Sequence, residues 1–299
     1  MNAWIRLLRP TSWVKNTLVF SALIFSGQWQ NPSALLVGLE IFVIFSLIAS
    51  SLYVLNDWRD RVRDRNHPRK KHRPIASGEI GGRGAVVGFV VLWLISFLML
   101  TFIPSGTVLP VMVVLTSYVL LILAYNFGLK NVAPLDMLIV SVGLLLRALA
   151  GGVAIGVSIT NWFMLAIFFI ALLLVAGKRR RELIDLESAQ MEAHRPVLGQ
   201  YTERFLDSVI SMMACASIIT YSLYTLEGDT TRIAVRWALP FSVLFVVFGI
   251  LRYLLLIYVE DGGSRPERIF VTDPPMIACI VAWVGYILCL FQGPSLLFF

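Results

Sequence analysis

The sequence predicts an all-α protein that crosses a membrane many times. Of its 299 residues, 58% are hydrophobic and only 14% are charged, and the mean hydropathy is +0.80. These values lie far outside the range of soluble globular domains. About nine apolar stretches divide the chain, most of them close to the ~20 residues that a helix needs to span a bilayer. They cover residues 13–30, 33–57, 84–103, 108–126, 134–156, 161–177, 205–226, 234–258 and 275–293.

The first stretch differs from the others because its unbroken apolar core covers only residues 17–27. Lys15, ahead of that core, is typical of the start of a secretory signal. The following residues, SGQWQNPS, contain no A-x-A cleavage pattern. We therefore expect a retained helix.

The placement of lysine and arginine predicts the orientation. With about nine spans and a cytoplasmic amino terminus, the outer loops carry only Arg232 and Arg236, as the positive-inside rule requires. The net charge of +7 therefore reflects topology first and a polyanionic ligand second. Because the basic clusters adjoin the membrane and no nucleic-acid module accompanies them, nucleic acid is not the expected partner.

Two long hydrophilic segments, residues 58–83 and 178–204, fall on the cytoplasmic side. Neither is long enough to form a domain, so we expect one integral membrane domain over residues 1–299 in which these loops cap the active site. Both contain His-Arg-Pro followed by a glycine. This echo is too short to establish a duplication by itself.

Three aspartates at helical spacing mark the end of the second stretch. If the helix of residues 33–57 continues, Asp57, Asp60 and Asp64 lie at i, i+3 and i+7 and share one face. Stacked like charges destabilise a helix unless a cation neutralises them. Mg²⁺ does so well, because it prefers carboxylate oxygen and takes further ligands from substrate phosphates. The alternative is a solvated helix end, with Asp57 paired to Arg61 and Asp60 to Arg65.

A burst of basic residues follows these aspartates. If the aspartates hold a metal, these basic residues can bind the phosphate groups of a substrate whose charge the metal does not neutralise. They are Arg59, Arg61, Arg65, Lys70 and Arg73.

One arginine lies inside an apolar stretch. Arg147 is about thirteen residues beyond Pro134, near mid-membrane, where an unpaired arginine costs at least ~2.5–3.5 kcal/mol. It must face a polar cavity or a carboxylate, and Asp136, three turns earlier, could share that cavity. A phosphate contact and a structural pair between helices are both open.

Taken together, these motifs resemble the UbiA superfamily of intramembrane prenyltransferases. Asn56-Asp57-x-x-Asp60-x-x-x-Asp64 is similar to the first aspartate motif of that superfamily, which implies nine helices around a central cavity open to the cytoplasmic interface. A longer set of motifs is similar to decaprenyl-phosphate phosphoribosyltransferases. It comprises Arg9-Pro10-x-x-Trp13-x-Lys15-Asn16, the run from Asp64 to Gly78, Tyr125-x-Phe127-Gly128-Leu129-Lys130, Arg147-Ala148-x-Ala150-Gly151-Gly152 and Gly177-Lys178-Arg179-x-x-Glu182-Leu183.

The resemblance implies Mg²⁺-dependent transfer of 5-phosphoribose from phosphoribosyl diphosphate to a polyprenyl phosphate, with release of diphosphate. Asn56, Asp57, Asp60 and Asp64 would hold Mg²⁺, and the three aspartates would act in catalysis through it. The substrate contacts would include Lys15, Asn56, Arg59, Lys70, Arg73, Tyr125, Lys130, Arg147, Lys178, Arg179 and Glu182. The implied setting is a bacterial inner membrane with a cytoplasmic active site, where the product serves arabinan synthesis for the cell envelope, and a homo-oligomer is compatible with it.

One departure from the superfamily pattern distinguishes the substrates. Prenyl-diphosphate users usually carry a second aspartate motif at the cytoplasmic end of the sixth helix, whereas this chain has four consecutive cations at residues 178–181. A cationic site binds a phosphate directly, which favours a lipid monophosphate. Glu182 and Asp185 leave a reduced acidic site open, so prenyl transfer from a diphosphate to an aromatic or other polar acceptor stays an alternative. A secondary transporter lined by Arg147 and Asp136 is another, but it leaves the aspartate spacing without a purpose.

Overall fold

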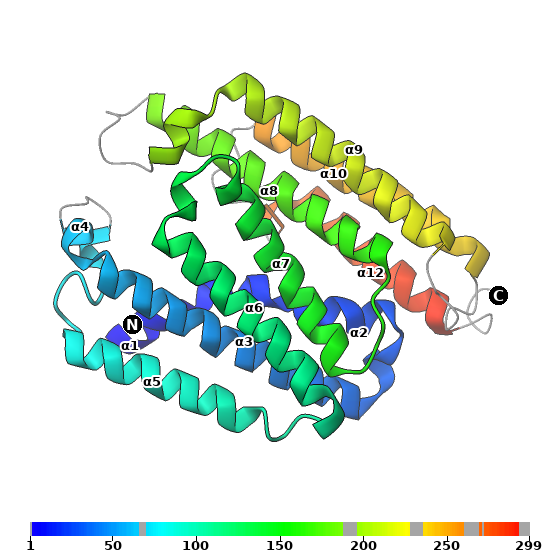
Figure 1. Cartoon of the computed structure of the whole chain (residues 1–299). Coiled ribbons are helices and arrows are strands. Elements are labelled where there is room, and N and C mark those ends of the chain that lie inside the picture. The colour runs from blue at the N-terminus through cyan, green and yellow to red at the C-terminus, as the bar shows by residue number, and fades with distance from the viewer. Residues whose placement is uncertain are drawn as a thin grey trace. The chain divides into compact units, whose positions relative to one another are not determined.

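The computed structural model describes residues 2–65, 70–187, 196–227, 236–259, 269–270 and 272–292, and the regular structure of these ranges is entirely helical (Figure 1). Eight helices among them are long and apolar enough to cross a membrane, which confirms the all-α class and fits an integral membrane protein. They are α3 (Pro32–Arg59), α5 (Gly82–Met99), α6 (Ser105–Phe127), α7 (Leu135–Ala154), α8 (Asn161–Glu187), α9 (Glu203–Glu227), α10 (Val243–Tyr258) with the preceding η7 (Arg236–Ser242), and α12 (Pro274–Gln292).

The first apolar stretch takes another form than the expected single helix. After α1 (Ala3–Leu8), a 3-10 helix η1 (Pro10–Phe20) leads into the short α2 (Ser21–Phe25) and η2 (Gln28–Gln30). Residues 11–17 include Thr, Ser, Val and Asn, which are weak helix formers. Gly27, at φ +68°, turns the chain after α2. The described residues therefore contain eight membrane-length helices where the sequence predicted about nine.

The chain folds as two compact units. Unit 1 comprises Met1–Leu23, Asn31–Leu129 and Leu146–Val157, and unit 2 comprises Ile24–Gln30, Lys130–Leu145 and Ser158–Phe299. Helix α7 contributes its first half to unit 2 and its second half to unit 1. Asp136 and Arg147 therefore belong to different units.

In unit 1, α3 is the central element. It packs along α5 and also contacts α1, η1 and α6 (Figure 1). Its fully buried side chains Ile41, Ile44 and Phe45 join Val111 and Ala150 in one core cluster. This packing places the last turn of α3, with Asp57, against the amino-terminal segment.

In unit 2, α8 and α9 form the most extensive helix pair, and α10 packs on α12 (Figure 1). Their core is built around Leu173, Leu206, Ile210 and Tyr253. The close pairing of α8 and α9 holds the polar end of α8 beside the start of α9.

The expected hydrophilic segments are largely helical where they are described. The segment after α3 contains α4 (Arg61–Arg65) and η3 (Lys70–His72), and α8 extends through residues 178–187 before η6 (Pro196–Gln200). The second loop is therefore shorter than predicted. Its first part, KRRRELIDLE, consists mostly of good helix formers, and Arg181 and Asp185 form an i, i+4 ion pair at 2.9 Å.

Candidate active site

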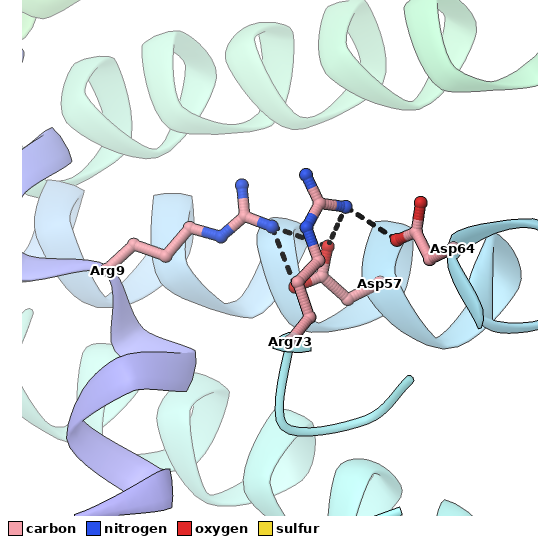
Figure 2. A network of polar contacts seen from close by, with 4 residues as sticks. All are labelled: Arg9, Asp57, Asp64 and Arg73. Atoms are coloured by element: carbon pink, nitrogen blue, oxygen red, sulfur yellow. Dashed lines mark hydrogen bonds and ion pairs between the residues drawn. The ribbon is translucent and has the colours of Figure 1, made fainter. Parts of the chain in front are cut away.

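Asp57 lies in the last turn of α3 between two arginines. Both of its carboxylate oxygens accept from Nη2 of Arg9, at 2.5 and 2.7 Å. Nη1 of Arg73 donates to Asp57 at 3.0 Å and to Asp64 at 2.7 Å. Figure 2 shows the two aspartates turned toward the same guanidinium. The side chains of the two aspartates are 2% and 3% exposed, so these ion pairs provide their charge compensation in a largely dry place.

The helix is interrupted at Asp60, between the two aspartates of this cluster. Helix α3 ends at Arg59, and Asp60 caps it in a bridge-region conformation, at φ −85° and ψ 3°. The backbone bonds nonetheless continue, from Asp60 N–H to Asn56 at 2.9 Å and from Asp64 N–H to Asp60 at 2.8 Å. The unbroken helix on which the shared face depended is thus interrupted at Asp60, but these bonds keep the helical spacing, and Asp57 and Asp64 converge on Arg73.

Arg61 and Asp57 do not form the pair that the solvated-end alternative required. Nη1 of Arg61 donates to the carbonyl of Trp58 at 2.9 Å, and its guanidinium lies over that ring at 5.0 Å from the centroid. The ion pairs of Asp57 come from Arg9 and Arg73 instead, because these arginines reach it from other segments.

Sequence reasoning did not select Arg9 as a site residue, although it begins the first motif. Arg9 has a left-handed backbone, at φ 52° and ψ 57°, a conformation that costs a non-glycine residue roughly 1–2 kcal/mol. Its guanidinium also lies over the ring of Tyr53 at 4.9 Å. Such strain persists where the surroundings over-determine it, and here it directs Arg9 at Asp57. The only signal in the sequence was the Arg9-Pro10 pair itself.

The aspartate pair fits a divalent cation. Asp57 and Asp64 bind one nitrogen, so their oxygens are no farther apart than the sum of the two distances. Mg²⁺ usually takes one or two protein carboxylates and completes its shell with water and substrate phosphates. Within the described ranges no group of three or more His, Cys, Asp or Glu residues could hold a metal by itself. The structure thus supplies a two-carboxylate site, with Asn56 and Asp60 partly buried beside it.

Arg59 ties the end of α3 to the end of α6. It donates to the carbonyl of Asn126 at 2.7 Å and lies over the ring of Phe127 at 4.4 Å. Asn126 directly follows Tyr125, another expected substrate residue. Tyr125, Lys15 and Lys70 are each partly buried in unit 1.

Arg147 binds polar side chains of unit 1. It is 6% exposed and donates from Nε to Asn16 at 2.7 Å and from Nη2 to Tyr118 at 2.9 Å. Its guanidinium also lies over the ring of Phe45. These contacts join α7 to η1, α3 and α6, which supports the structural reading of Arg147. Neither Asn16 nor Tyr118 was selected from the sequence.

Unit 2 contains a second charged network at the polar end of α8. Arg179 is 2% exposed and donates to Asp136 at 2.7 Å and to Glu182 at 2.6 Å. The hydroxyl of Tyr201 donates to the other oxygen of Asp136. Arg179, expected to contact a lipid phosphate, is therefore bound by two carboxylates.

The neighbouring arginines are paired in the same way. Arg180 bonds Asp207 and Glu203, each at 2.5 Å, and Arg181 bonds Asp185. Lys178 is partly buried at the start of this run. Glu182 and Asp185, which left a second acidic metal site open, are each neutralised by an arginine.

Gln200 holds the linker between α6 and α7. Its Oε1 accepts from the N–H of Ala133 at 3.2 Å, and its Nε2 donates to the carbonyl of Asn131 at 2.8 Å. This linker, residues 128–134, includes Lys130, an expected substrate contact that is partly buried. Gln200 and Tyr201 together fix the linker and the first turn of α7, a role that sequence patterns did not reveal.

Comparison with known proteins assigns the fold. The UbiA prenyltransferase family matches residues 16–272 of the chain. The chain belongs to this family. A UbiA homologue from Archaeoglobus fulgidus, solved with GPP and Mg²⁺, superimposes with a TM-score of 0.70 at 20% identity, covering 97% of this chain and 100% of that one.

Three curated relatives have a higher sequence identity to this chain than that solved structure. The decaprenyl-phosphate phosphoribosyltransferase of Mycolicibacterium smegmatis is 34% identical over 95% of this chain and 90% of its own length. The protein of that name from Mycobacterium tuberculosis is 35% identical, over 94% and 91%. The nodulation protein NoeC of Azorhizobium caulinodans is 33% identical, over 91% and 88%.

Proposed function

We propose that this UbiA-family chain transfers 5-phosphoribose from phosphoribosyl diphosphate to a polyprenyl phosphate of the decaprenyl type. The observation that carries the proposal is the 34–35% identity to phosphoribosyltransferases of that name over at least 90% of both chains. The paired arginines at residues 179–181 support it, because they occupy the place where a second acidic metal site would serve a prenyl diphosphate.

The donor would bind at the aspartate pair of unit 1. Asp57 and Asp64, with Asn56 and Asp60 beside them, would hold Mg²⁺ on its diphosphate. When bound, the metal neutralises the diphosphate and makes it a better leaving group. Basic and polar side chains of unit 1 would bind the rest of the donor: Lys15, Arg59, Lys70, Arg73 and Tyr125. Lys130, in unit 2, stays an expected substrate contact.

The transfer breaks the bond between ribose C1 and the diphosphate oxygen, which leaves with the bonding electrons. An oxygen of the lipid phosphate then forms the new bond to C1, where positive charge develops in the transition state. No protein nucleophile is required, and a phosphate monoester is ionised near neutral pH without a strong general base. The protein would act mainly by holding the two anions in position.

For the acceptor, Lys178 would be the phosphate contact. Arg179 already binds two carboxylates, so its role would be to position the helix end that carries Lys178. That residues 58–83 and 178–204 form a common cytoplasmic cap of a single domain stays a prediction, as do the bacterial inner membrane and a homo-oligomer. Residues 66–69 and 188–195 of these loops lie outside the described residues.

The test is an incubation of the purified protein with Mg²⁺, labelled phosphoribosyl diphosphate and decaprenyl phosphate, followed by lipid extraction. We expect label in the lipid phase and release of diphosphate. A parallel incubation pairs geranyl diphosphate with 4-hydroxybenzoate. Product in that incubation alone would reject the proposal in favour of prenyl transfer.

A further inference from the structure

One nitrogen of Arg73 occupies the point where two buried carboxylates converge. Nη1 lies 3.0 Å from Asp57 and 2.7 Å from Asp64 (Figure 2). A divalent cation shared by the two aspartates would need this same position. Arg73 and such a metal therefore compete for one place.

The charges of the cluster already cancel. Asp57 and Asp64 carry two negative charges, and Arg9 and Arg73 carry two positive ones. A divalent ion added to these four side chains would leave an excess of two positive charges, or of one if Asp60 also binds the ion, and either excess is unfavourable away from bulk water. A diphosphate that arrives with the ion removes that excess.

The two arginines differ in how firmly they are held. Arg9 binds both oxygens of Asp57 and lies over the Tyr53 ring. Each arginine uses a single nitrogen, and their side chains are about equally exposed, at 25% and 26%. The nitrogen of Arg73, however, is shared between two acids and lies farther from Asp57, at 3.0 Å against 2.5 and 2.7 Å for Arg9. It stands on the turn between η3 and Gly78, where its backbone N–H bonds Lys70. The geometry therefore makes Arg73 the exchangeable partner and Arg9 the fixed one.

We propose that Arg73 is an internal counter-ion that gives way to the metal only when the metal arrives with a diphosphate. Its guanidinium then leaves Asp57 and Asp64 and pairs with the diphosphate, while Arg9 remains as a positioning residue on Asp57. This inference rests on the proposed function for the identity of the donor. Its consequence is that divalent metal and diphosphate bind with strong positive coupling.

The test measures Mn²⁺ binding to the purified full chain in detergent by electron paramagnetic resonance, with and without inorganic diphosphate. Since Mn²⁺ shares the oxygen preference of Mg²⁺, it reports on the same ligands without turnover. For the wild type we expect diphosphate to raise Mn²⁺ affinity by about tenfold or more. In Arg73→Gln, the Mn²⁺ affinity without diphosphate should rise by about tenfold. The factor by which diphosphate raises Mn²⁺ affinity should then be smaller than in the wild type.

Arg9→Gln is the matched control, because it removes the same charge and leaves the bridging position filled. In this variant, the Mn²⁺ affinity without diphosphate should rise clearly less than in Arg73→Gln. An equal rise in Mn²⁺ affinity in the two variants would mean that only the net charge matters, and it would overturn the proposed exchange of Arg73 for the metal. Wild-type protein that binds free Mn²⁺ as tightly as with diphosphate would overturn it without any variant.

Asp57→Asn should abolish the binding. Mn²⁺ that persists in this variant would bind elsewhere, which would also overturn the proposal. The measurement separates this inference from the proposed function. Strong coupling in a protein that transfers no phosphoribose would reject the donor's identity and leave the exchange supported.

Discussion

Arg179 donates from Nε to Asp136 at 2.7 Å, and the two side chains are only 3% and 0% exposed. The pair joins the polar end of α8 to the first turn of α7. The hydroxyl of Tyr201, in the segment before α9, donates to the other oxygen of Asp136. A buried ion pair adds little net stability when intact, but removing one partner leaves an uncompensated charge. The pair is therefore sensitive to truncation.

Asp136→Ala should lower the free energy of unfolding by about 3–5 kcal/mol. Thermal unfolding of the purified protein in a fixed detergent measures this change. Glu203→Ala is the control, because Glu203 is 44% exposed in its pair with Arg180 and such pairs contribute about 1 kcal/mol or less. Equal stability of the two variants would show that the Asp136 pair is not buried as described.

Lys178→Ala should mainly raise the KM for polyprenyl phosphate, since a contact to the ground-state phosphate contributes largely uniform binding. The KM for phosphoribosyl diphosphate should change less. Arg179 is left in place in this variant, because its removal would also release Asp136 and confuse the result. Steady-state kinetics with each substrate varied in turn provides the measurement.

Arg204→Ala controls for topology, because Arg204 is an exposed cation at the start of α9, which lies beside the polar end of α8. It should leave both KM values unchanged. If Lys178→Ala inserts normally and also keeps the lipid KM, the contact is rejected. A loss confined to the ribosyl donor would assign Lys178 to the other substrate.

Asp60→Asn should reduce phosphoribosyl transfer to below a tenth of wild type, a barrier difference of at least ~1.4 kcal/mol, with little loss of stability. Asp60 is partly buried at the end of α3. Asp57→Asn should lose both activity and stability, because Asp57 is buried between Arg9 and Arg73. Turnover above a tenth in Asp60→Asn at saturating Mg²⁺ would remove that residue from the metal ligands.

Patterns along the sequence predicted what depends on local periodicity. Hydropathy predicted the eight membrane-length helices, and the spacing of Asp57 and Asp64 predicted that they converge. The prediction of a single helix for the first stretch was wrong, because an apolar run is compatible with a 3-10 helix as well as with an α-helix. The motif residues around Lys178 were selected, but their helical extension to Glu187 was read as loop.

The sequence could not predict which residues bind the charged side chains, for another reason. Arg9 and Asp57 are 48 positions apart, and Arg147 and Asn16 are 131 apart. No periodicity relates residues at such separations, so a buried charge shows only that some partner must exist. Tyr201, a single tyrosine after a loop, gave no signal that it would bind Asp136.

Gly151 provides a steric test of the packing that holds Arg147. A Cβ added at Gly151 would lie 1.9 Å from the carbonyl oxygen of Val19 and 2.8 Å from its carbon. These are backbone atoms of η1, so no flexible side chain can move aside. One turn earlier on α7, Arg147 bonds Asn16 of the same segment. Separating α7 from η1 to fit a methyl group would therefore also stretch that buried hydrogen bond.

Gly151→Ala should accordingly destabilise the protein by about 3 kcal/mol or more, at the upper end of the cost of overpacking. Gly285→Ala is the matched control. Gly285 lies in α12 with nothing within 4 Å of its added Cβ, and alanine is favoured over glycine in a helix by roughly 1 kcal/mol. Thermal unfolding in detergent should thus show a large decrease in Tm for the first variant and none for the second. A Gly151→Ala protein as stable as Gly285→Ala would contradict the direct contact between α7 and η1, and with it the anchoring of Arg147 by Asn16.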